Sequence, residues 1–128
     1  MNIESLSFHK EHCWVRIEGN KATIGITDYA QEELGDIVYI EPPDIGVDVS
    51  MNEEITEIES TKTTSPVISP ISGRIIDINE ELEDSPELIN EDPYGRGWIS
   101  VLEMSDTSEA EHLMDLKEYD EYIKEEAV

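Results

Sequence analysis

Apolar and polar residues alternate over much of the first half of the chain, a pattern typical of β-strands with one buried face. Residues 13–26 read CWVRIEGNKATIGI, and the polar letters EGNK separate two alternating stretches. This arrangement predicts a β-hairpin. Residues 37–40, IVYI, predict another strand. That strand must end before Pro42 and Pro43, because neither proline has the N–H that a sheet ladder needs.

The segment TDYAQEELG, between these strands, has the features of a short helix. Thr27 or Asp28 can cap its N-terminus, and Gly35 provides a C-terminal stop. Ala30 and Leu34 are four residues apart, so they share one face of the helix. We expect one short internal helix here.

Shorter alternating stretches continue after the prolines. VDVSMNEEITEIES predicts strand residues on both sides of a polar turn near Asn52, and SPVISPISGRIIDINEEL predicts two short strands separated by Gly73. LEDSPELINEDPYGRG is rich in proline and glycine and predicts a turn-rich connection. WISVLEM predicts a final strand.

The apolar period changes after the last predicted strand. Ser108 and Glu111 have the S-x-x-E spacing of a capping box. An amphipathic helix is therefore expected over about residues 106–126, with a break near Lys117. Its apolar positions recur at three- and four-residue steps: Leu113, Leu116, Tyr119 and Ile123.

Together these elements predict a mainly β fold, an antiparallel sandwich or small barrel with a short internal helix and a helical tail. The length of 128 residues fits one domain.

Charge and composition argue against several classes of partner and location. The chain has 8 Lys and Arg against 32 Asp and Glu, for a formal net charge of −24. Such a surface repels phosphate groups, so we expect no nucleic acid and no anionic membrane as partner. No apolar run approaches the ~20 residues of a membrane span, and the N-terminus lacks the pattern of a signal peptide. The single cysteine, Cys13, excludes an internal disulfide and fits the cytoplasm.

Motifs for catalysis and metal binding are missing from the sequence. His9, His12 and His112 lack metal-ligand spacing with Cys13. We find neither a Ser-His-Asp context nor a glycine-rich phosphate-binding motif. We therefore expect no catalytic residue and no metal site.

Lys62 lies in the middle of the predicted hairpin TEIESTKTTSPVISPISG, residues 56–73. An ordinary surface lysine at a turn is the simplest interpretation. A reactive lysine normally needs a pKa lowered by burial or by a cationic neighbour. Lys62 is flanked instead by hydroxyl residues and Glu59, which favour the charged, exposed form, so we do not expect a Schiff-base lysine.

The residues around Lys62 resemble those of a known family. IESTK is followed eight positions after the lysine by PISG, with GITDYAQEELGDIVYIE upstream and INEDPYGRGWI downstream. These blocks, in this order, resemble the H-protein of the glycine cleavage system. The resemblance covers about residues 8–104 and continues into the acidic tail.

The resemblance implies a lipoyl/biotinyl-type flattened antiparallel barrel-sandwich over about residues 8–104, with an acidic helix over about 106–126, all in one carrier domain. H-proteins are not enzymes. They carry lipoic acid in amide linkage to the lysine that matches Lys62, and such an arm would reach on the order of 14 Å. Glu59 would help the lipoate-attaching enzyme to recognise the hairpin.

The implied partners are three enzymes. A pyridoxal-phosphate glycine decarboxylase loads an aminomethyl group onto the arm, and a tetrahydrofolate-dependent aminomethyltransferase removes the carbon. Dihydrolipoamide dehydrogenase then reoxidises the dithiol. We expect a cytoplasmic monomer.

In the family the loaded arm folds back into a cleft. Ile26, Ala30 and Leu34 could receive the hydrocarbon chain, and Glu33 could pair with the ammonium; Ile26 and Leu34 could equally be simple core residues, and Glu33 a solvated helix residue. Cys13 also matches a cleft position, although the family often has Glu or Thr there. Further departures flank the lysine: Thr61, Thr63, Thr64 and Pro66.

Several alternatives remain open. The chain could relay lipoyl groups to other lipoate-dependent complexes. It could carry biotin, although Thr61 and Thr63 stand where biotin carriers usually have Met. A lipoyl domain of a 2-oxoacid dehydrogenase is normally tethered by long Pro/Ala linkers, which this sequence lacks. An enzyme with a reactive lysine is the fourth alternative.

Overall fold

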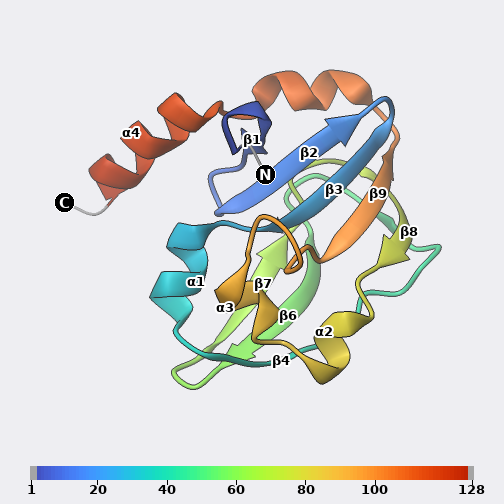
Figure 1. Cartoon of the computed structure of the whole chain (residues 1–128). Helices are drawn as coiled ribbons and strands as arrows, with labels where there is room; N and C mark the ends of the chain where they lie inside the picture. The colour runs from blue at the N-terminus through green and yellow to red at the C-terminus, as the bar shows by residue number, and fades with distance from the viewer. Residues whose placement is uncertain (1–2, 127–128) are drawn as a thin grey trace.

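Two antiparallel sheets pack against each other in the computed structural model, which describes residues 3–126 (Figure 1). The larger sheet has the strand order β1-β2-β3-β9-β8-β5, and the smaller has β4-β6-β7. This confirms the prediction of a mainly β sandwich. The strands of the larger sheet are β1 (Ser7–Phe8), β2 (Cys13–Glu18), β3 (Lys21–Ile26), β5 (Asp48–Val49), β8 (Gly73–Ile78) and β9 (Ser100–Met104). Those of the smaller sheet are β4 (Ile37–Ile40), β6 (Glu54–Ser60) and β7 (Thr64–Ile68).

The predicted hairpin over residues 13–26 is confirmed as β2 and β3. Its register runs from Cys13↔Ile26 to Glu18↔Lys21. Gly19, the first of the two loop residues, has φ 64°, which suits a two-residue hairpin loop that needs glycine at its first position.

The expected internal helix is α1 (Asp28–Leu34). The Thr27 side chain caps it by accepting a hydrogen bond from the Ala30 N–H, and Gly35 follows its last turn. The chain also holds α2 (Glu81–Asp84) and α3 (Leu88–Glu91). The expectation of one internal helix was therefore wrong in number, because single-turn helices are too short to show a 3.6-residue period.

The C-terminal segment is helical with a break, as predicted, but its capping residues differ from the prediction. Asp106, not Ser108, caps the 3-10 helix η2 (Thr107–His112) through the Ser108 N–H at 3.0 Å. The capping box belongs to Asp115 and Glu118, whose side chains accept from each other's backbone N–H ahead of α4 (Leu116–Glu126). The chain leaves helical geometry at residues 113–115, so the break lies before Lys117.

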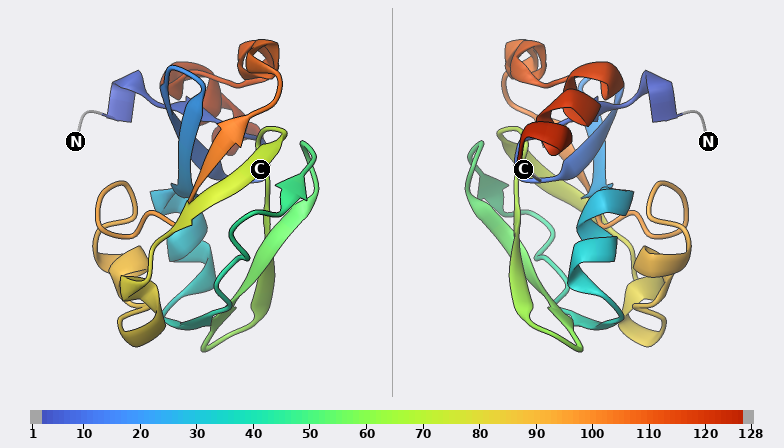
Figure 2. Two further views of the ribbon diagram at one scale, coloured as in Figure 1. Left: turned by 90° about the vertical axis from the view of Figure 1, so that its right-hand side faces the viewer. Right: turned by 90° about the vertical axis from the view of Figure 1, so that its left-hand side faces the viewer.

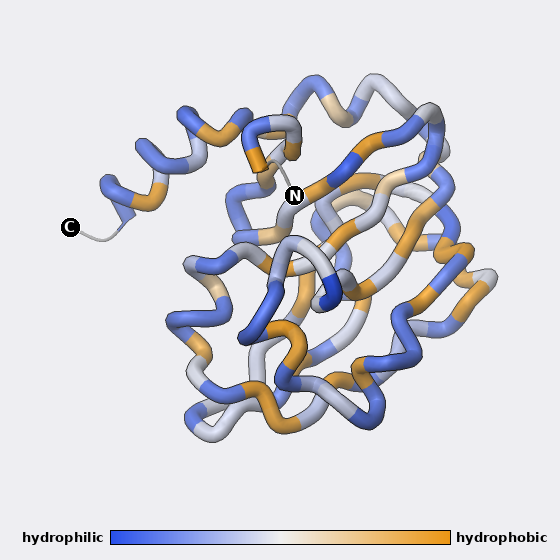
Figure 3. The backbone as a smooth tube through the Cα atoms, in the orientation of Figure 1, coloured by the Kyte–Doolittle hydropathy of each residue, from blue (hydrophilic) through white to orange (hydrophobic). Residues whose placement is uncertain are grey.

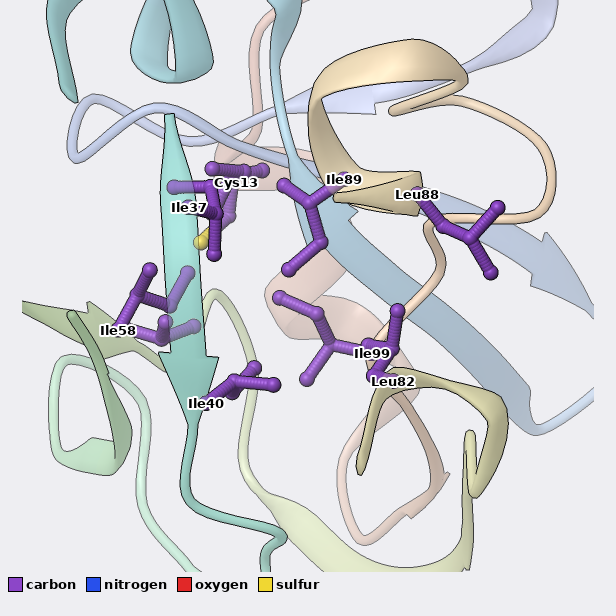
Figure 4. Packing of buried hydrophobic residues seen from close by; sticks show 10 residues of the cluster. Cys13, Ile37, Ile40, Ile58, Leu82, Leu88, Ile89 and Ile99 are labelled. Atoms are coloured by element: carbon purple, nitrogen blue, oxygen red, sulfur yellow. The ribbon is translucent and has the colours of Figure 1, made fainter. Parts of the chain in front are cut away.

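In Figure 3, hydrophobic and hydrophilic residues alternate along the strands. The buried apolar side chains form three clusters. One core cluster fills the sandwich and is shown in Figure 4. A second contains residues of β2, β3, β5, β8 and β9. A third joins the N-terminal residues to α4 through Leu6, Phe8, Trp14 and Tyr119. There, Phe8 of β1 pairs with Met114, and the short helix η1 (Ile3–Ser5) precedes it. Within the described residues, no helix is long and apolar enough to span a bilayer.

Candidate functional site

Lys62 lies at the tip of the β6–β7 hairpin, where its side chain is exposed. The last ladder pair is Glu59↔Thr64. Beyond it, the Ser60 N–H donates to the Thr63 carbonyl at 2.8 Å. The Ser60 hydroxyl oxygen also accepts from the backbone N–H groups of Lys62 and Thr63, each at 3.1 Å. The tip therefore has a defined backbone conformation rather than a loose one.

The hairpin tip is tied to the connection between α1 and β4, which lies beside it in both views of Figure 2. The Thr61 N–H donates to the Asp36 carbonyl at 3.0 Å. Asn90 of α3 fixes that connection in turn: its Oδ1 accepts from the Ile37 N–H and its Nδ2 donates to the Gly35 carbonyl, both at 2.9 Å. Asn90 was not among the predicted site residues, and no local pattern in the sequence shows that it reaches a segment 53 residues away.

The Lys62 side chain lies over Gly35. A Cβ built on Gly35 would lie 3.3 Å from Lys62 Cε and 3.8 Å from Nζ. Glycine therefore leaves room for the lysine at the end of α1. Glu59, the other predicted hairpin residue, is exposed and pairs with Tyr39 of β4.

A groove of about 350 Å³ runs between α1 and the β6–β7 hairpin. It holds four of the five predicted cleft residues, Ile26, Ala30, Glu33 and Leu34. Its full lining is Glu11, His12, Ile26, Tyr29, Ala30, Glu33, Leu34, Ile58, Ser65, Pro66 and Val67.

Cys13 does not line this groove, which corrects the expectation for that residue. Its side chain is buried in the core of the sandwich (Figure 4) and its thiol donates to the Ile68 carbonyl at 3.3 Å. Burial raises the pKa of Cys13 to about 12, so the thiol stays neutral and cannot serve as an anionic partner for a cation.

The groove has an acidic side. Glu11 and Glu33 both line it and are exposed. Partial desolvation and then the nearby carboxylates of Glu33 and Glu126 raise the pKa of Tyr29. Tyr29 therefore keeps its hydroxyl proton at neutral pH, and the fixed charges at this end are carboxylates.

His12 lines the same end of the groove and was not among the predicted site residues. Its ring contacts residues that are distant in sequence: Nδ1 lies 2.8 Å from the Tyr119 hydroxyl, and Nε2 lies 2.9 Å from a Glu126 carboxylate oxygen. Only the fold brings these groups together. No group of three potential metal ligands occurs within residues 3–126.

Comparisons with known proteins give consistent matches over nearly the whole chain. A family model described as "Glycine cleavage H-protein" matches residues 6–126. A protein of Coprothermobacter proteolyticus named "Glycine cleavage system H protein" is 48% identical over 124 residues, covering 96% of this chain and 98% of that protein. One of Arabidopsis thaliana, "Glycine cleavage system H protein 2, mitochondrial", is 49% identical over 97% of this chain and 80% of its own length. The crystal structure of a glycine cleavage system H protein from Mycobacterium marinum superposes with a TM-score of 0.82 at 33% identity, covering 98% of both chains.

Proposed function

The chain belongs to the glycine cleavage H-protein family, and on this premise we propose that Lys62 is the residue to which its lipoic acid is attached. The family is lipoylated. Its members carry intermediates between the P, T and L proteins of the glycine cleavage system and do not catalyse the reactions themselves. This protein is therefore a carrier. Its structure must make the arm accessible to the partner enzymes and shield the group that the arm carries from water.

The display of Lys62 supports its assignment. An attaching enzyme needs an accessible amine whose root is held still, and Lys62 is exposed on a hydrogen-bonded hairpin tip. The remaining lysines lie elsewhere in the fold: Lys10 precedes β2, Lys21 begins β3, and Lys117 and Lys124 belong to α4. Lys62 also adjoins Gly35, the residue after the groove residue Leu34.

The dimensions of the groove support docking of the arm along α1. The seven residues of α1 extend about 10 Å at 1.5 Å per residue. An arm that reaches on the order of 14 Å can therefore extend from Gly35 along the length of this helix. The volume of about 350 Å³ lies within the range of small-ligand pockets.

The lining suits a chain that is apolar along its length and cationic at its end. Ile26, Ala30 and Leu34 offer apolar contacts, and Glu11 and Glu33 offer carboxylates for an ammonium. Water converts an S–CH₂–NH₃⁺ group into a thiol, formaldehyde and ammonium, breaking the C–S and C–N bonds. A groove that excludes water slows this loss.

The finer identities of the partners belong to the same proposal. We assign the pyridoxal-phosphate decarboxylase, the tetrahydrofolate-dependent aminomethyltransferase and dihydrolipoamide dehydrogenase as the enzymes visited, and a lipoate-attaching enzyme that contacts Glu59. We further propose a cytoplasmic monomer. A single carrier domain is supported by the packing of Tyr119 of α4 into a core cluster shared with Phe8 and Trp14.

Intact mass after expression with active lipoylation tests the assignment. We expect the mass to increase by one lipoyl group, located by peptide mapping to the segment with Lys62. Lys62→Arg should fold normally, remain unmodified and abolish glycine-dependent CO₂ exchange with the decarboxylase. Lys21→Arg is the matched control and should behave like the parent. A lipoyl group on another residue would refute the assignment.

A further inference from the structure

The hydroxyl of Tyr119 connects α4 to the end of the groove. Its oxygen lies 2.8 Å from His12 Nδ1 and 2.7 Å from Thr27 Oγ1. His12 lines the groove. Thr27 caps α1 by accepting from the Ala30 N–H at 3.2 Å, and Ala30 also lines the groove. The Tyr119 hydroxyl therefore contacts both chain segments that line this end of the groove, one through His12 and the other through Thr27.

Tyr119 is itself firmly placed. The residue is 2% exposed, and its ring stacks on Phe8, with centroids 4.8 Å apart and planes 9° from parallel. Burial raises the pKa of its hydroxyl, so the group remains a neutral donor and acceptor.

One assignment of the protons satisfies every group in this chain of hydrogen bonds. With its proton on Nε2, His12 donates to Glu126 and its Nδ1 accepts from the Tyr119 hydroxyl. The Tyr119 oxygen then accepts from the Thr27 hydroxyl. Buried hydroxyls are costly when unpaired, and Thr27 is fully buried, so the chain favours a single orientation of the His12 ring.

The backbone alone does not fix that orientation. The Thr27 N–H donates to the His12 carbonyl at 3.0 Å, which sets the spacing of the two segments. It leaves the imidazole free to rotate, however. His12 has φ 68°, in the left-handed region where a residue with a Cβ needs support from its surroundings. The ring is held by its contacts with Tyr119 and Glu126 of α4 and by Tyr29 of α1, whose ring centroid lies 4.8 Å away.

We propose that Tyr119 is a positioning residue for the lipoyl arm. Its hydroxyl fixes the His12 ring where that ring lines one end of the groove, so the shape of this end depends on the docking of α4. This inference rests on the proposed function, because it assumes that the arm lies in the groove. It follows that α4 determines how well water is kept from the cargo of the arm.

The first test uses the unmodified protein. Tyr119→Phe keeps the stacked ring and removes the hydroxyl. We expect the ¹H–¹⁵N signals of the His12 ring to shift and broaden, and exchange of the Ala30 amide to rise about tenfold, the effect of losing hydrogen bonds of ordinary strength. Tyr122→Phe, whose ring lies 6.0 Å from that of His12, is the matched control and should leave both readouts unchanged.

The second test uses lipoylated protein that the decarboxylase has loaded from glycine. Release of formaldehyde should be about tenfold faster from Tyr119→Phe than from the parent or Tyr122→Phe. Ile75→Val, in the second core cluster, destabilises the fold at a distance from the groove and should release at the parent rate.

The outcomes separate the two proposals. Equal release from Tyr119→Phe and the parent, or unchanged His12 ring signals, would overturn the role of Tyr119. Faster release from Ile75→Val as well would also overturn it, because general destabilisation would then explain the effect. A parent protein without a lipoyl group on Lys62, seen by mass before the assay, would refute the proposed function instead.

Discussion

Replacing Gly35 with alanine tests how the root of the Lys62 side chain is held. Gly35 follows α1 with φ 81° and ψ −156°, a backbone region that is essentially restricted to glycine. A residue with a Cβ is strained there by about 1–3 kcal/mol. The new Cβ would also lie 3.3 Å from Cε and 3.6 Å from Cδ of Lys62. The contact with Cε is tight and that with Cδ is ordinary, so the end of the flexible lysine side chain would have to shift.

We expect Gly35→Ala to lower the free energy of unfolding by about 2 kcal/mol, the middle of that range. The melting temperature should fall by roughly 8 °C, at about 4 °C per kcal/mol for a chain of this length. Urea denaturation measures the first quantity and a thermal scan the second. The rate of lipoylation of the purified unmodified protein should also fall, because the amine leaves the position set by the hairpin and α1.

Gly19→Ala provides the matched control. Gly19 also has a left-handed φ, 64°, but a Cβ there meets no atom within 4 Å. This variant should lose about 1–2 kcal/mol of stability through backbone strain alone and be lipoylated at the parent rate. Parent-like stability of Gly35→Ala would refute the backbone strain at this position. An equal loss of lipoylation in both variants would refute the role of the contact with Lys62.

Four further predictions concern other residues. Asn90→Ala should cost about 1–3 kcal/mol in urea denaturation, because it leaves backbone groups of the α1–β4 connection without their partner. Glu59→Gln should slow lipoylation by a purified attaching enzyme without changing stability; an unchanged rate would remove Glu59 from recognition. Burial lowers the pKa of His9, so below about pH 6.5 the unfolded chain binds more protons than the folded protein does. The free energy of unfolding should therefore fall as the pH is lowered through this range. It should fall by less in His9→Asn. Cys13 should resist thiol reagents at pH 8 until the protein unfolds, since burial raises its pKa to about 12; rapid labelling of folded protein would contradict this.

The elements that could be predicted from the sequence are those with a local cause. The β2–β3 hairpin follows from alternation around a polar turn, and α1 follows from a cap at Thr27, an apolar face and a stop at Gly35. The position of Lys62 in a hairpin also follows from its flanking strands. Each of these features involves neighbours within a few residues, which the order of the amino acids shows directly.

Where two local signals competed, the sequence did not decide between them. Ser108–Glu111 and Asp115–Glu118 both have capping-box spacing, and only the second pair forms the reciprocal bonds. The choice depends on where the chain must turn so that Met114 can pair with Phe8 and Tyr119 can stack on it. Packing against the sheet therefore selected the helix start.

By itself, the sequence determined the strands, the first helix and a solitary lysine on a tight turn, because periodicity and capping are short-range properties of the chain. Only the tertiary structure decided that Cys13 lies in the core away from the groove, while Ile26 belongs to the same core cluster and also lines the groove. It also decided that Asn90 holds the connection beside the lysine. It also brought Tyr119 to His12, 107 residues away. Such contacts depend on how two sheets and a helix pack in space, and residues that meet in this way need no common pattern along the chain.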